Sequence, residues 1–94
     1  MKLGEVRKMK LIDDDSWKPL IAPMAVIEGK EPIMQVTLDE EGDWLAFGIT
    51  DSDDLDCVSL EEALTLDPTL ATLPDMRFGQ TAWRDAVDAE WYVE

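Results

Sequence analysis

The sequence predicts an α+β fold, in which a small antiparallel β-sheet carries one short helix and a helical turn on one face. Two observations predict it. Residues 33–49 alternate with a period of two on both sides of a glycine-containing connection, as in a hairpin. Residues 59–68 carry both a helix start and a helix stop signal. The 94 residues fit a single domain, 1–94, in which residues 1–15 are expected to be mobile or loosely attached.

The N-terminal third has no clean hydrophobic period. We expect a short strand or turn around residues 8–12 and a turn at residues 13–16. Pro19 and Pro23 favour an extended segment, because proline and the residue before it disfavour helix. Residues 24–29, MAVIEG, are predicted to form a short strand.

The hairpin is the clearest strand signal in the chain. Met34, Val36 and Leu38 fall on one face of an extended segment, and the alternation resumes from Trp44 to Ile49. Gly42, in the connection DEEGD, suits a hairpin turn that needs a positive φ.

The segment SLEEALTLDP predicts a short helix. Ser59 can accept a hydrogen bond from the backbone three residues on, where Glu62 completes a capping box. Pro68 ends the helix after Asp67, and this pair also resembles the start of a second helical turn. The residues expected to point inward from the helix and the turn are Leu60, Ala63, Leu64, Leu70 and Leu73.

The C-terminal segment is predicted to return to the sheet. TAWRD reads as a strand with Trp83 on one face and Ala82 and Arg84 on the other, and WYV reads as a final strand. Trp44 and Trp83 are expected in the core, because a domain of this size needs large aromatic side chains there. Trp91 is the best candidate for a tryptophan that is exposed or covered by a partner.

Composition excludes several classes of protein. The net charge is −14, and residues 31–94 carry only Arg77 and Arg84 against seventeen acids, which disfavours direct binding to nucleic-acid phosphates. The absence of histidine excludes Cys/His zinc sites and imidazole-based triads. A single cysteine, no signal-peptide pattern and no apolar run long enough for a bilayer predict a cytoplasmic protein without membrane contact.

The stretch DSDDLDCVSLEE, residues 51–62, is read as an acidic loop before the helix. Asp51, Asp53 and Glu62 match ligand positions of an EF-hand, but Leu55 and Asp56 occupy a ligand position and the required glycine. We therefore expect no metal and no cofactor. Without a cleft or a glycine-rich phosphate loop, we expect no catalytic residues and no enzyme.

Three further residues have structural interpretations. Arg77 and Arg84 are each expected to pair with a nearby carboxylate. Cys57 is expected to be a small buried residue.

The order of motifs resembles a known family. GDWLAF, an acidic segment, VSLEEALTLDPTLATLPD, Gly79 and AWRD follow one another between about residues 22 and 91. In this order the chain is similar to a family of small bacterial proteins of unknown function grouped with polymorphic-toxin immunity proteins. Gly42-Asp43 stands where that family has a direct Gly-Trp pair. The resemblance implies an interaction role and brings no catalytic residues.

These observations favour an acidic, immunity-like protein that binds a basic protein partner such as a toxin domain. The residues expected to bind the partner are Asp51, Asp53, Asp54, Asp56 and Trp91. One alternative is a nucleic-acid mimic, whose carboxylates would stand in rows at phosphate-like spacing; the other is a protein with a weak calcium site. Unpaired sheet edges could also pair two copies into a homodimer.

Overall fold

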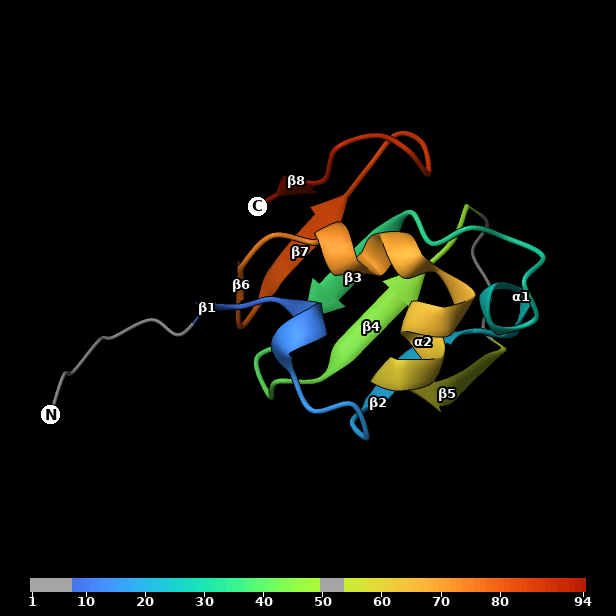
Figure 1. Ribbon diagram of the computed structural model, residues 1–94, viewed down its shortest axis with the longest axis horizontal. Coiled ribbons are helices and arrows are strands. Elements are labelled where there is room, and N and C mark those ends of the chain that lie inside the picture. The colour runs from blue at the N-terminus through green and yellow to red at the C-terminus, as the bar shows by residue number, and fades with distance from the viewer. Residues whose placement is uncertain (1–7, 50–53) are drawn as a thin grey trace, which may run out of the picture.

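A six-stranded sheet forms the centre of the protein, and the computed structural model describes residues 8–49 and 54–94. The strands are β1 (Lys8–Met9), β2 (Pro19–Pro23), β3 (Gln35–Leu38), β4 (Trp44–Phe47), β5 (Leu55–Ser59), β6 (Met76–Arg77), β7 (Gln80–Trp83) and β8 (Tyr92–Val93). The α-helices are α1 (Met24–Ile27) and α2 (Leu60–Leu66), and the 3-10 helices are η1 (Leu11–Asp13) and η2 (Pro68–Thr72). Figure 1 shows η1, α2 and η2 on one side of the sheet. The α+β prediction is confirmed.

The strand order of the large sheet is β5-β2-β4-β3-β7-β8. The predicted hairpin is present, with β3 and β4 antiparallel and Gly42 at φ +88° in the turn. The sheet is not purely antiparallel, because β2 and β4 run parallel. From β2 the chain passes through α1 to β3, which leaves one strand position between β2 and β3. Strand β4 then fills that position.

Two local predictions were wrong. Residues 24–27 form helix α1 rather than a strand: Pro23 precedes its first turn, and Gly29 follows its end at φ +77°. Residues 55–59, read as part of the acidic loop, form the edge strand β5, which pairs with β2 from Pro19↔Ser59 to Pro23↔Leu55. Strand β5 depends on its pairing with β2, which carries few strand signals of its own, and α1 follows β2 directly in the chain.

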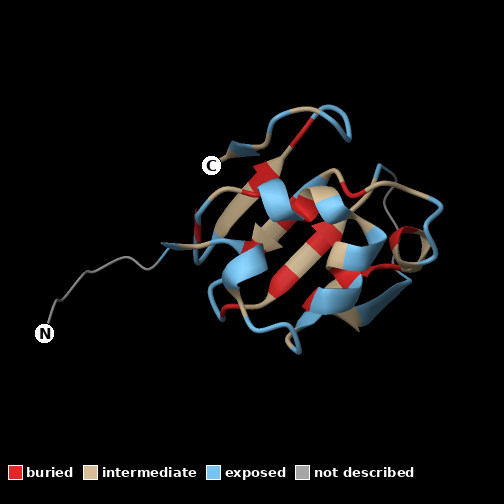
Figure 2. Ribbon diagram, viewed as in Figure 1, coloured by how far each residue is buried: buried red, intermediate tan, exposed pale blue. Residues whose placement is uncertain are grey.

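The core lies between one face of the sheet and the helices. Trp44 and Ala46 on β4 are fully buried and alternate with half-buried residues, as the colours along that strand show in Figure 2. The predicted inward-facing residues Leu60, Ala63, Leu70 and Leu73 are buried against this face, and Leu64 packs partly against it. The predicted cap is also present, since the Glu62 backbone N–H donates to Ser59 Oγ at 3.1 Å.

The segment 8–15 belongs to this core, unlike the loosely attached end that we expected. Its β1 strand pairs with β6, and Leu11 in η1 is 1% exposed. Residues 1–7 lie outside the described residues.

Asp14 ties this segment to the central strand. Its Oδ2 accepts hydrogen bonds from Trp44 Nε1 at 2.8 Å and from Lys18 Nζ at 3.0 Å. Burial by itself raises the pKa of the Asp14 carboxyl, but the hydrogen bonds from Trp44, Lys18 and the Asp15 backbone, with the charge of Lys18, outweigh it and hold the pKa below its ordinary value.

Arg84, at the end of β7, is the charged residue buried most deeply in the described chain, at 3% exposure. Its guanidinium donates to the Ile33 backbone carbonyl from Nε at 3.1 Å and from one terminal nitrogen at 2.7 Å. It also donates to Thr69 Oγ1 at 2.8 Å and to the Val87 carbonyl at 2.9 Å, and it pairs with Asp67 Oδ2 at 2.9 Å. The predicted pairing with a carboxylate is confirmed.

Removing this guanidinium should destabilise the fold strongly. We expect Arg84→Met to lower the free energy of unfolding by about 3–5 kcal/mol, because Asp67 and the Ile33 carbonyl lose a charged donor that no other described side chain replaces. Urea unfolding measures the loss. The matched control is Arg77→Met, which removes an exposed arginine and should cost within about 0.5 kcal/mol. Equal losses in the two variants would contradict the assigned role.

The Asp14 contacts predict a pH dependence of stability. Because the folded pKa lies below the ordinary value of 3.8, the stabilisation is complete above about pH 4 and is lost as the pH falls through the lower folded pKa. In urea titrations at several pH values, the free energy of unfolding of wild type should therefore exceed that of Asp14→Asn near neutral pH. The difference between the two should become smaller in acid. Asp13→Asn, at an exposed neighbour, should follow wild type throughout. A difference in the free energy of unfolding that stays constant with pH would contradict the stabilising role assigned to the Asp14 carboxylate.

Candidate protein-binding surface

The structure describes only some of the acidic residues that we predicted to bind a partner. Asp54 and Asp56 are exposed at the edge of the sheet, while Asp51 and Asp53 lie outside the described residues. Asp56 is paired in register with Ala22, so it belongs to the helix-bearing side of the sheet, and its Oδ1 accepts from the Cys57 backbone N–H at 2.8 Å. The structure therefore places part of the expected cluster on an edge strand instead of a loop.

Trp91 is less exposed than we expected. Its ring is half-buried against the core, stacks on the Arg84 guanidinium at 4.1 Å from the ring centroid, and donates from Nε1 to Thr72 Oγ1 at 3.2 Å. The most exposed tryptophan of the described chain is Trp17, at 72%. Trp91 thus has a clear structural role in covering the arginine.

The far side of the sheet is the most unusual surface of the protein. Except for Pro23, every buried residue of the large sheet lies on the side that carries η1, α2 and η2. The register assigns the alternate residues to the other side, here called the open face. Its members are Pro19, Ile21, Pro23, Gln35, Thr37, Leu45, Phe47, Leu55, Cys57, Ser59, Thr81, Trp83 and Tyr92.

None of these open-face positions carries a charge, although 32% of the chain is charged. Along the strands of an antiparallel sheet that has one face in water, polar residues on the exposed face ordinarily alternate with apolar residues on the buried face. Here the alternation places large apolar side chains on both sides, and Leu55 and Tyr92 on the open face are 46% and 52% exposed. Such apolar exposure, rimmed by polar residues, is typical of a binding surface.

Side-chain contacts across the strands confirm that these residues share a face. The Thr37 and Thr81 hydroxyl oxygens lie 2.9 Å apart, so that one hydroxyl donates a hydrogen bond to the other. The rings of Trp83 and Tyr92 have centroids 5.9 Å apart. Trp83 is therefore a half-buried open-face residue and not the core residue that we predicted, whereas Trp44 is fully buried as predicted.

Cys57 also lies on the open face, where it is exposed. The prediction of a buried cysteine was wrong because it treated the residue as part of a loop leading into the helix. In β5 its side chain lies on the same side as Ile21, away from the core.

Acidic residues flank the open face at both ends of the strands. The β3–β4 turn, residues 39–43, follows the end at which Leu38 pairs with Trp44. Residues 85–90 follow the opposite end, at which Gln35 pairs with Trp83. Exposed carboxylates in these two segments are Glu40, Glu41, Asp85, Asp88 and Glu90. The open face is therefore an uncharged strip between two anionic ends.

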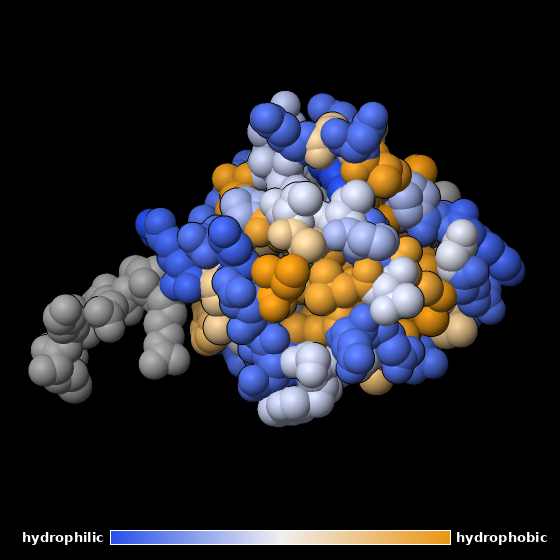
Figure 3. All heavy atoms as spheres, viewed as in Figure 1, coloured by the Kyte–Doolittle hydropathy of each residue, from blue (hydrophilic) through white to orange (hydrophobic). Residues whose placement is uncertain are grey.

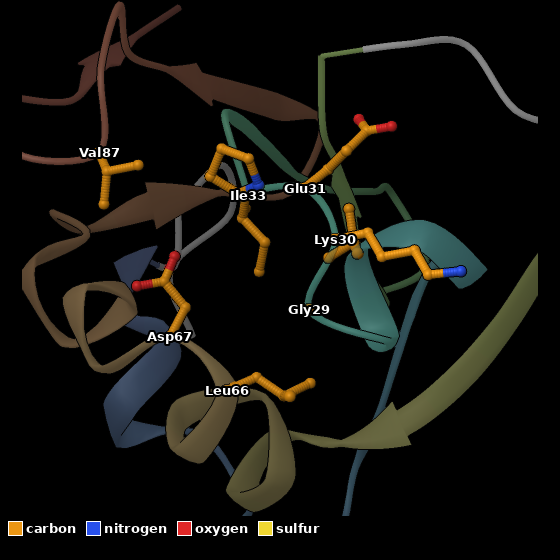
Figure 4. Close-up of a pocket in the computed structure, with 9 residues that line it drawn as sticks. Gly29, Lys30, Glu31, Ile33, Leu66, Asp67 and Val87 are labelled. Carbon is orange, nitrogen blue, oxygen red and sulfur yellow. The ribbon is translucent and has the colours of Figure 1, made fainter.

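A hollow of about 340 Å³ lies between α1, the end of α2 and the β7–β8 connection. Figure 4 shows Ile33 and Leu66 lining it, while Lys30 and Glu31 extend away from it. Its charged groups are engaged elsewhere: Asp67 with Arg84, Lys30 with Glu28 at 3.2 Å, and Glu31 with the Ile49 backbone N–H at 2.8 Å. The hollow offers an apolar wall and no convergent acid–base pair.

The helix-bearing side, seen in Figure 3, also shows hydrophobic atoms, which gather near its centre with hydrophilic ones around them. The large apolar residues exposed on its helices are Ile12 and Leu66, at 47% and 45%. Exposed charges on the same helices, Asp13, Glu61 and Glu62, interrupt this surface. It therefore differs from the open face, whose strand positions are uncharged.

Within residues 8–49 and 54–94, no three acidic or sulfur side chains come together as a metal site. The same residues contain no helix that could cross a bilayer. No protein-family model matches the chain, and no curated protein and no solved structure matches it.

The sequence reasoning missed the open face, although a signal was present. In WLAF and TAW both alternating sets of residues lack charge, a pattern more typical of strands covered on two sides. Only the strand pairing shows that Leu45, Phe47 and Trp83 meet on one surface.

Because Cys57 is exposed, we expect its thiol to be reactive in the folded protein. The native protein should react with a thiol reagent such as DTNB at one equivalent without denaturant, at a rate on the order of that of the unfolded chain. The control is Cys57→Ser/Ala46→Cys, which moves the thiol to a position that is 0% exposed on the covered face. That thiol should react only as fast as the fold opens. Slow labelling of native Cys57 would show that the open face is covered.

Proposed function

We propose that this protein is a non-enzymatic, immunity-like binding domain that captures a basic protein partner, such as a toxin domain, in the cytoplasm. Its acidic surface attracts the partner, because complementary charge accelerates encounter and selects against acidic proteins. The capture site would include exposed carboxylates at the ends of the sheet and at the β5 edge, among them Asp54 and Asp56.

The observation that carries this proposal is the imbalance of surface charge. Three ion pairs join residues of the described chain, and they use Lys18, Lys30 and Arg84. Two of these bases, Lys18 and Arg84, pair with largely buried carboxylates and so do little for the outer surface. Residues 85–90 contain three exposed acids and no base, so their field is not offset within the segment, whereas the acids of residues 39–43 lie at the end of the sheet near Lys8 and Arg77.

The alternatives receive less support. A nucleic-acid mimic requires carboxylates in rows along a face, whereas the strand positions of the open face are uncharged and the described acids are divided among strand ends, the β5 edge and the helices. A calcium site would depend on Asp51 and Asp53, which are outside the described residues, and no metal-binding group forms within the described ones.

Affinity capture from the source cell at low salt tests the proposal. The tagged chain should retain a basic protein that is released as salt rises, since exposed ionic contacts weaken with screening. A variant with Glu40→Gln, Glu41→Gln, Asp85→Asn and Asp88→Asn should retain roughly ten-fold less of it. The control with the same change of charge is Asp13→Asn, Glu61→Gln, Glu62→Gln and Asp75→Asn, four exposed acids outside these two segments, and it is expected to act weakly. Recovery of no basic protein at low salt would refute the proposal.

A further inference from the structure

We propose that the open face is the docking surface, and that its occupant is a protein whose own apolar patch is bordered by lysine or arginine residues. This inference rests on the proposed function and specifies how the basic partner is recognised. The acids at the two ends of the strands would pair with the partner's basic border, while Ile21, Leu45, Phe47 and Trp83 would contact its apolar centre.

The dimensions of the sheet explain why both parts are needed. Six strands spaced about 4.8 Å apart, five of them four to five residues long and β8 two residues long, give an area of at most roughly 24 by 15 Å, or about 360 Å². This is within the size of functional apolar patches, about 300–600 Å². A stable complex covers about 800 Å² on each partner. The apolar strip alone is too small, so its flanking acidic segments must share the interface.

The negative charge of the chain indicates which partner the open face would bind. A second copy would bring two molecules of net charge −14 together with their acidic strand ends at the same interface, and such like-charge contact is unfavourable. A basic protein converts the same carboxylates into attractive contacts. The chemistry of the surface therefore favours a cationic partner over self-association.

Internal contacts leave this face ready for such a partner. The hydroxyls of Thr37 and Thr81 bond to each other at 2.9 Å, so covering them leaves neither without a hydrogen bond. Trp83 and Tyr92 already pack together, which reduces the side-chain entropy lost on binding. Aromatic residues held in this way are common anchors in protein interfaces.

Two defined peptides of equal charge test the proposal: Ac-(Lys-Leu)5-NH2, whose extended form has one apolar face, and Ac-(Lys-Ser)5-NH2, which lacks it. At low salt the Lys-Leu peptide should bind at least ten-fold tighter than the Lys-Ser peptide. It should also slow maleimide labelling of Cys57 several-fold, because Cys57 lies on the covered surface.

Matched variants locate this preference. Leu55→Gln/Tyr92→Gln removes apolar groups that are 46% and 52% exposed on the open face and should reduce the ten-fold preference to two-fold or less. Ile12→Gln/Leu66→Gln removes groups of similar exposure, 47% and 45%, from the helix-bearing side and should leave the ten-fold preference unchanged. Neither pair alters the net charge, so the comparison isolates apolar contact.

The other outcomes separate the two proposals. Equal binding of both peptides, or a preference that Leu55→Gln/Tyr92→Gln leaves intact, would overturn the docking surface while the capture of basic partners stands. Binding of neither peptide would overturn both. Protection of Cys57 that grows with protein concentration, together with a dimer in sedimentation, would replace the basic partner by a second copy and overturn the stated occupant.

Discussion

The fold depends on the burial of one guanidinium. Arg84 reaches the Ile33 carbonyl before β3, the Asp67 cap of η2 and the Val87 carbonyl before β8, so a single side chain joins three separate segments. A charge at this depth is tolerated only because each donor finds a partner, and the Trp91 ring covers it on one side. Trp91, which resembles a binding residue in the sequence, is therefore engaged in a structural contact with Arg84 while remaining half-buried.

Elements that depend on residues close together in the sequence were predicted correctly. The hairpin around Gly42 and the Ser59 cap depend on residues a few positions apart, and both are present. Strand β5 and the parallel pairing of β2 with β4 depend on partners more than twenty residues away. No local pattern specifies such pairing, and DCVS therefore looked like a loop. Helix α1 was missed because four residues after a proline carry too short a period to identify.

The candidate surface was hidden for the same reason. The acidic cluster is visible as consecutive letters, whereas the open face assembles single residues from different strands, such as Ile21, Leu45, Cys57 and Tyr92. Composition predicts the sign of the protein's own charge, because charge is additive along the chain. It could not predict where apolar contact occurs, because that requires knowing which side of each strand the helices cover.

The pairing of β1 with β6 also affects how the protein forms. Lys8 and Met9 meet Arg77 and Met76, and Leu11 packs in a core completed by Leu70 and Leu73. During synthesis the segment that contains β1 and Leu11 emerges before its neighbours and must wait until residues 70–77 have been made. Such distant pairing slows folding, because closing the loop costs entropy before any contact is gained. In the interval the nascent chain exposes apolar residues that a chaperone could shield.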